Sequence, residues 1–125
     1  MPNPDSMRIL RDGEELIYES HASYIGGLSD KEKEITGSLV LTNTRLSFEY
    51  AVGGLFSKRT ENLLNYQLPD VTEVKIDKMG LITKKFMLRV SVNSSGVLVC
   101  PSFRIREEDA KGWMDAVSNV IRKRR

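Results

Sequence analysis

The chain has 125 residues, 40% hydrophobic and 29% charged, which is the size and composition of one globular domain with its own core. A single cysteine and a single histidine exclude a disulfide framework and a metal site built from several Cys and His ligands, and they fit a reducing compartment. The net charge of +2 divides into about −4 for residues 1–50 and +6 for residues 51–125, and this basic second part can attract anionic lipid, nucleic acid or an acidic protein.

The N-terminal sequence MPNPDSMRILRDGEE lacks the apolar run of a signal peptide, and no stretch approaches the roughly 20 apolar residues of a transmembrane helix. We therefore expect a cytoplasmic protein that contacts a membrane only peripherally. Residues 1–12, with two prolines, are expected to form a flexible arm, and residues 13–125 one domain.

Period-two alternation of apolar residues predicts strands in the first half of the chain. Residues 14–22, EELIYESHA, form the first predicted strand. Residues 37–50, GSLVLTNTRLSFEY, predict a β-hairpin in which Asn43 and Thr44 make the reversal, because Asn tolerates positive φ and bonds locally. We expect Arg45, just past that turn, to have a structural role.

The second half continues the pattern at short spacing. Strands are predicted over residues 63–68 and 71–76, on either side of Pro69-Asp70, and over 86–92 and 97–103, on either side of the loop NSSG at 93–96. About seven strands at this spacing are typical of a small sandwich or barrel.

The apolar period then changes to that of a helix. An amphipathic stripe begins at Ala110 and consists of Ala110, Trp113, Met114, Val117, Val120 and Ile121. Acidic residues precede this helix and basic residues end it, which complements the helix dipole. Gly112 weakens the helix by up to about 1 kcal/mol relative to Ala, so packing of the stripe has to dominate.

Seven strands followed by one helix with a tryptophan resemble the pleckstrin-homology (PH) superfold. Residues 37–48, GSLVLTNTRLSF, resemble the G-x-L-x-L-T-N-x-R-L-x-F hairpin of GRAM-type and bacterial PH-like domains, and residues 68–74, LPDVTEV, resemble their L-x-D-I-x-x-V segment. The resemblance implies a mainly β fold, a seven-stranded bent barrel or sandwich capped by one C-terminal helix, with Trp113 and Val117 facing inward. The loops at 24–34, 52–61 and 93–96 would lie at the other end.

A narrower resemblance is to the GLUE domains of the endosomal sorting machinery. These are PH-like, and some bind ubiquitin or phosphoinositides. The sequence GEE at 13–15, leading into a strand, and the hairpin ending in RL at 45–46 are similar to that subfamily. Both families are non-catalytic binding modules with no cofactor.

Loop composition gives the candidate binding residues. Residues 52–61, VGGLFSKRTE, place the apolar pair Leu55 and Phe56 beside Lys58 and Arg59, a combination suited to a peripheral membrane contact, to a protein contact, or to simple packing on the barrel. Residues 24–28, YIGGL, again place apolar residues around paired glycines, and residues 77–85 combine apolar and basic residues. The candidate lipid- or partner-binding residues are therefore Leu55, Phe56, Lys58, Arg59, Tyr24, Ile25, Lys84 and Lys85.

The region where PH domains read phosphoinositides departs from their pattern. Here Lys31 and Lys33 alternate with carboxylates in DKEKE, and residues 35–40 contain no arginine, so specific inositol-phosphate binding at this position is disfavoured. This departure favours a protein partner, for example a ubiquitin-like fold on a strand edge or on the exposed helix face.

Other functional classes have little support in the sequence. His21 and Cys100 are expected to be half-buried strand residues, and no nucleophile–base pair, Gly-rich phosphate loop or metal spacing is present, so we expect no enzyme and no catalytic or metal-binding residue. Scattered cations at a pI of 8.7 do not form the basic stripe of a nucleic-acid binder. The sequence predicts an adaptor that recruits its host protein to an anionic membrane or, alternatively, a ubiquitin-binding module of a membrane-trafficking complex of the ESCRT type.

Overall fold

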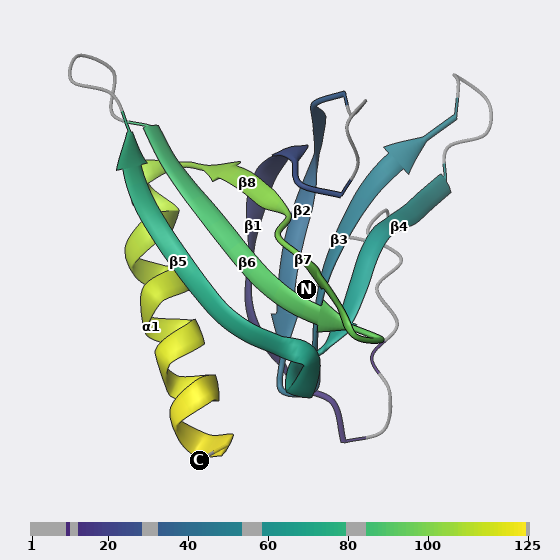
Figure 1. The fold of residues 1–125 in the computed structure, drawn as a ribbon. Coiled ribbons are helices and arrows are strands. Elements are labelled where there is room, and N and C mark those ends of the chain that lie inside the picture. The colour runs from purple at the N-terminus through teal and green to yellow at the C-terminus, as the bar shows by residue number, and fades with distance from the viewer. Residues whose placement is uncertain (1–9, 11–12, 29–32, 54–58, 80–84, 125) are drawn as a thin grey trace.

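The computed structural model describes residue 10 and residues 13–28, 33–53, 59–79 and 85–124. These residues form eight β-strands followed by one helix (Figure 1). The strands are β1 (Leu16–Gly26), β2 (Ile35–Thr42), β3 (Arg45–Val52), β4 (Arg59–Gln67), β5 (Val71–Met79), β6 (Lys85–Ser94), β7 (Val97–Val99) and β8 (Ser102–Ile105). A 3₁₀ turn at Leu68–Asp70 connects β4 to β5, and the helix α1 spans Glu107–Arg124.

The strands form one antiparallel sheet in the order β4-β3-β2-β1-β8-β6-β5, with β7 paired to β6. The sheet is bent so that β1 to β4 make one arm and β5, β6 and β8 the other, and α1 lies alongside β5 and β6 (Figure 1). The helix contacts β1, β5 and β6 and so closes one side of the bent sheet. This architecture confirms the predicted mainly β, PH-like fold with one C-terminal helix.

The predicted hairpin is confirmed as β2 and β3. Leu39 faces Phe48 and Leu41 faces Leu46 in the register, and all four side chains are buried in the core. Thr42 ends β2 and Arg45 begins β3, so the reversal occupies the two predicted residues.

Several strand predictions need correction. The first strand spans Leu16–Gly26 instead of residues 14–22, because Tyr24 pairs both with Ile35 of β2 and with Phe103 of β8. The strand predicted over 63–68 spans Arg59–Gln67, and the one predicted over 71–76 continues to Met79. The stretch predicted as one strand over 97–103 is two strands, β7 and β8, separated by Cys100 and the buried Pro101. Proline has no N–H to give to the ladder, so it interrupts the strand, and the count rises from seven to eight.

The helix is anchored by Trp113, which is fully buried as predicted. Its indole N–H donates a hydrogen bond to Ser20 Oγ at 2.8 Å, and its ring meets Tyr18 edge-on at a centroid distance of 4.9 Å. Gly112 lies against the same Tyr18 ring, where a Cβ atom would overlap it. The helix therefore uses glycine at this position because it packs closely on β1.

The other predicted stripe residues differ in burial. Ala110 and Val120 are buried and Val117 packs partly against the core, but Met114 is 57% exposed. The inclusion of Met114 in the buried stripe was wrong, since its side chain lies at the edge of the helix–sheet contact.

Candidate functional site

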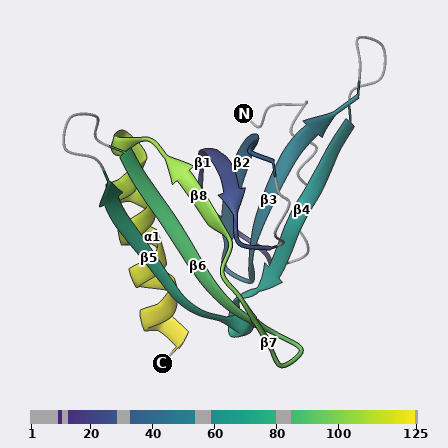
Figure 2. The same cartoon turned by 45° about the horizontal axis from the view of Figure 1, so that its top comes forward.

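The strand order fixes the end of the sheet at which each connection lies, because neighbouring strands are antiparallel. The connections at 27–34 and 53–58 and the tight β6–β7 turn lie at one end, and the connection at 80–84 lies at the other. Because the sheet is bent into two arms, β3 and β5 nevertheless both run toward the top of Figure 2. The expectation that residues 93–96 lie at the same end as the connections at 27–34 and 53–58 agrees with the strand order, because β1, β3 and β6 run in the same direction in the sheet. Ser95 and Gly96 make that turn with φ of 54° and 85°, the positive values of a type I′ hairpin.

Two of the strand connections, β3 to β4 and β5 to β6, contain a matching sequence. Residues 54–58 read GLFSK and residues 80–84 read GLITK, and each is followed directly by a cation that begins a strand, Arg59 of β4 and Lys85 of β6. The predicted site residues Leu55, Phe56, Lys58 and Lys84 fall within these two segments and lie outside the described residues, as does the side chain of Lys85. The repeated order Gly, Leu, apolar residue, Ser or Thr, Lys is recognised only when the two segments are compared with each other.

Arg59 is the predicted cation whose side chain the structure describes. Its side chain is 71% exposed, and its Nε donates to Glu61 Oε1 at 2.9 Å. A solvent-exposed pair of this kind contributes about 0–1 kcal/mol to stability, so the guanidinium can exchange its partner for another anion at little cost.

Tyr24 is not a loop residue, contrary to expectation. It lies in β1 with 1% of its surface exposed, stacks near Phe103 at a centroid distance of 5.7 Å, and accepts a hydrogen bond from the Leu28 N–H at 3.0 Å. Its side chain belongs to the core and presents no surface to a lipid or a partner. Ile25, the next residue of β1, is half-buried.

Arg45 has the structural role predicted for it. Its guanidinium donates to both carboxylate oxygens of Glu14, at 2.8 and 3.2 Å, and the hydroxyls of Thr42 and Thr44 donate to the same carboxylate, each at 2.7 Å. Asn43 bonds the backbone of residues 13 and 15 on either side. We name residues 13–15 and 42–45 the N-terminal clasp, because these contacts hold the start of the chain onto the β2–β3 turn.

A polar pocket of about 240 Å³ opens on the outer face of β1, β2 and β8 beside His21, Arg104 and Arg106. His21 and Cys100 are both exposed, so the expectation that they are half-buried was wrong. The two guanidiniums already pair with carboxylates, Arg104 with Glu34 at 2.6 Å and Arg106 with Asp109 at 2.9 Å. This pocket therefore offers little net positive charge to an anionic ligand.

Ionisable groups interact where the helix begins. Burial, with the nearby Asp109 carboxylate, raises the pKa of the Tyr18 phenol, whose hydroxyl donates to Asp109 Oδ1 at 3.2 Å. The hydrogen bond and charge of Asp109 likewise raise the pKa of the Arg106 guanidinium. The phenol is neutral and the guanidinium charged at physiological pH, so these groups tie α1 to β1 and do not form an acid–base pair.

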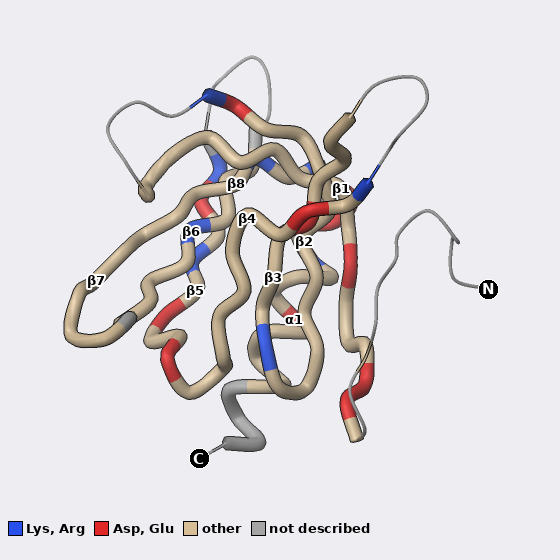
Figure 3. The backbone as a smooth tube through the Cα atoms, turned by 90° about the vertical axis from the view of Figure 1, so that its right-hand side faces the viewer, with Lys and Arg blue, Asp and Glu red and all other residues tan. Residues whose placement is uncertain are grey.

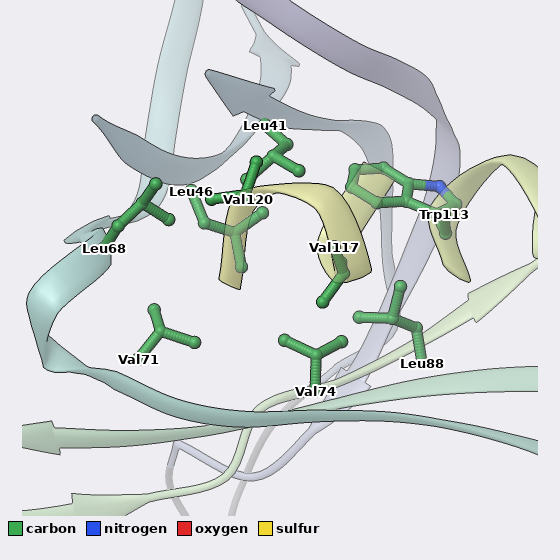
Figure 4. Close-up of a pocket in the computed structure, with 9 residues that line it drawn as sticks. All are labelled: Leu41, Leu46, Leu68, Val71, Val74, Leu88, Trp113, Val117 and Val120. Carbon is green, nitrogen blue, oxygen red and sulfur yellow. The ribbon is translucent and has the colours of Figure 1, made fainter. Parts of the chain in front are cut away.

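An apolar groove runs between α1 and the edge strand β5. Its inner part is a cavity of about 20 Å³ in which Val117 and Val120 of the helix face Val74 and Leu88 of the sheet (Figure 4). This volume has room for about one water molecule and is far too small for a ligand. Toward the surface the groove widens to about 140 Å³ and adds Ile76, Met114 and Ser118 to its lining.

Metal and membrane-spanning features are not found within the described parts of the chain. Their His, Cys, Asp and Glu residues contain no group of three or more that could hold a metal ion. Among them no helix has the length and apolar character needed to span a membrane.

Comparison with known proteins supports the fold. No family model matches the sequence, and no curated protein matches it. A solved structure described as the N-terminal PH domain of Vps36 is similar, with a TM-score of 0.64 and 18% sequence identity, over 96% of this chain and 88% of that one. The chain therefore has the pleckstrin-homology-like fold.

Proposed function

We propose that this PH-like module attaches its host protein to an anionic membrane surface through the apolar–basic segments at residues 53–59 and 79–85. The observation behind the proposal is that two matching apolar–basic segments, GLFSKR and GLITKK, follow β3 and β5, which both run toward the top of Figure 2 on the two arms of the bent sheet.

The chemistry of the two segments suits the boundary of a bilayer. Each cation near an anionic leaflet contributes about 1 kcal/mol, and burying a Phe or Leu side chain among the acyl chains contributes roughly 2 kcal/mol. Either segment alone would bind weakly, whereas both together supply the apolar and the electrostatic contributions that stable peripheral attachment requires. The interleaved carboxylates of DKEKE at 30–34 disfavour specific recognition of one phosphoinositide at that position, so the proposed attraction comes from the cations of the two segments.

Charge elsewhere on the strands is mixed, which makes a matched control available. Basic and acidic segments alternate along β5 and β6 (Figure 3), where Lys75 pairs with Glu73 at 3.3 Å and Arg89 with Asp77 at 3.6 Å. Lys75 and Arg89 face each other across β5 and β6. Removing both changes the net charge as much as removing Lys58 and Arg59.

The test is flotation with neutral vesicles, phosphatidylserine vesicles, and phosphoinositide vesicles of matched charge, at low and high salt. We expect binding to both anionic kinds, weakened by salt, lost in Lys58→Ala/Arg59→Ala and retained in Lys75→Ala/Arg89→Ala. Phe56→Ser should lower binding while leaving the denaturation midpoint close to wild type. Failure of the wild-type chain to float with any vesicle, or equal losses in the two double variants, would overturn the proposal.

A protein-interaction function is the second candidate, and the groove between β5 and α1 supports it. Met114 presents 57% of its surface beside half-buried Val74, Ile76 and Val117, so an apolar side chain of a partner could pack there. A ubiquitin-like fold is the first partner to titrate. Binding that resists salt but is lost in Met114→Asp would favour this function over membrane attachment.

A further inference from the structure

The strand β5 lies at an edge of the sheet. It ends the strand order, and β6 is its only partner among the described strands. Within the described part of the chain, residues 72–79 make no backbone hydrogen bond outside the strand ladder. An edge strand presents free N–H and C=O groups along its outer side, and these groups can pair with another strand. At about 3.4 Å per residue, the nine residues of β5 offer a row of such groups about 30 Å long.

The apolar groove between β5 and α1 opens beside this edge. Figure 1 shows α1 alongside β5, which is the outermost strand of its arm. Val74 and Ile76 of β5 and Met114 of α1 line the outer part of the groove, which measures about 140 Å³. Pockets for small molecules measure about 300 Å³ or more, so this space suits apolar side chains instead. A strand added to β5 would direct every second side chain toward the groove, because side chains alternate between the two faces of a strand.

Two exposed lysines lie at one end of the groove. Lys78 follows Ile76 on the same face of β5, and it is exposed. Lys111 lies one turn before Met114 on the same side of α1, and it is also exposed. The register from β5 through β6 to β8 places Lys78 next to the start of α1, so both lysines lie at the same end.

These two cations are available to a partner. Among the ion pairs of the described residues, none includes Lys78 or Lys111. Glu107 lies at the same end of the helix, but it has an interaction of its own. The groove therefore combines an apolar lining with positive charge at one end, which complements a segment that has apolar residues and one acidic residue.

We propose that β5 and α1 bind an extended peptide segment of a partner protein. The segment adds to the edge of β5 as a further strand, places alternate apolar side chains in the groove, and places an acidic side chain beside Lys78 and Lys111. It runs antiparallel to β5, which is the more stable pairing, so its acidic residue precedes the apolar ones. Main-chain hydrogen bonds supply affinity in this mode of binding, and the side chains supply selectivity. The inference rests on the groove as a protein-binding surface, the second candidate function, and does not depend on membrane attachment.

Hydrogen exchange measured by NMR on the full chain tests the added strand. The probes are synthetic peptides of the pattern Glu-Thr-X-Thr-X-Thr, in which each X is Val, Leu, Ile or Phe. We expect members of this set to slow the exchange of alternate β5 amides, those that face away from β6, about tenfold at a peptide concentration ten times the Kd. Unchanged exchange with every member at about 1 mM peptide would overturn the proposal.

Two other outcomes would also overturn strand addition. A ubiquitin-like fold that binds the groove without protecting the β5 amides would leave the protein-interaction function standing and remove the added strand. Protection that appears without peptide and rises with protein concentration would mean that a second copy of this chain occupies the edge.

Variants test the groove and its charge. Met114→Asp should weaken peptide binding at least about tenfold, because it places a charge in the apolar groove. Asn119→Asp adds the same charge at an exposed position outside the groove lining and should leave binding unchanged. Lys78→Ala/Lys111→Ala should weaken binding about three- to tenfold for the Glu peptide but not for the same peptide with Gln in its place. Equal binding by the Met114 and Asn119 variants, or equal binding of the Glu and Gln peptides to the wild type, would contradict the proposal, and Trp113 fluorescence establishes that each variant is folded.

Discussion

Gly112→Ala tests the close contact between α1 and β1. An exposed helical glycine normally gains up to about 1 kcal/mol when replaced by alanine. At this position the added Cβ would lie 2.5 Å from Tyr18 Cε2 and closer still to its Cζ and Oη, where ordinary contact begins near 3.4 Å. The ring cannot yield freely, because it packs edge-on against Trp113 and its hydroxyl is bonded to Asp109.

Gly112→Ala is therefore expected to destabilise the protein, although helix propensity alone predicts that it stabilises the protein. Overpacking in a core costs about 1–3 kcal/mol, and losing the Tyr18–Asp109 hydrogen bond costs about 1–2 kcal/mol more. Subtracting the propensity gain leaves a net destabilisation of about 1–4 kcal/mol. Urea denaturation followed by the fluorescence of Trp113, the single tryptophan, measures this value.

A double-mutant cycle separates the steric overlap of the new Cβ atom with the Tyr18 ring from the effect of helix propensity. With the ring removed by Tyr18→Ala, the Gly112→Ala change should become neutral or stabilising by up to about 1 kcal/mol. Asn119→Gly compared with Asn119→Ala, at an exposed position of the same helix, reports the Gly-to-Ala propensity gain alone. A Gly112→Ala change that stabilises the wild-type chain, or that destabilises both backgrounds equally, would refute the reasoning.

Further predictions concern the same helix and the N-terminal clasp. Glu14→Gln should lower the free energy of unfolding by about 3–5 kcal/mol in a denaturation titration, because it leaves the guanidinium of Arg45 nearly buried without its charged partner, and a change below 1 kcal/mol would contradict the clasp. Trp113→Ala should cost about 3–5 kcal/mol as a core deletion, and an unchanged melting curve would contradict the position of the helix. Because the pKa of Tyr18 is raised in the fold, its contribution to stability is complete below the unfolded pKa of about 10 and is lost as pH rises through the folded pKa. Tyr18→Phe should therefore show a smaller loss of stability in melting curves recorded above pH 10, and identical alkaline slopes would contradict this.

The sequence by itself determines the elements of this fold, because their signals are local. Alternation at Leu39, Leu41, Leu46 and Phe48 specifies a hairpin with one buried face, and the 3.6-residue stripe around Trp113 specifies the terminal helix. Each pattern extends over only a few residues, and the spacing of its apolar side chains indicates which face of the element is buried.

What only the tertiary structure decides depends on residues far apart in the chain. Tyr24 reads as a loop residue until β8 pairs beside it, and Gly112 reads as a weakness in the helix until Tyr18 is placed against it. Glu14 is buried only because the β2–β3 turn folds back over it. Sequence periodicity carries no information about such distant neighbours.

The sequence also predicts some features of the candidate membrane site, and the tertiary structure decides the others. Composition identifies the apolar and basic residues of GLFSKR and GLITKK, because it is a property of each short segment. That residues 54–58 and 95–96 connect strands at one end of the sheet, and residues 80–84 at the other, follows from the strand order and from the direction in which each strand runs. Strand order depends on pairing between residues that are far apart in the chain, so only the folded structure shows it.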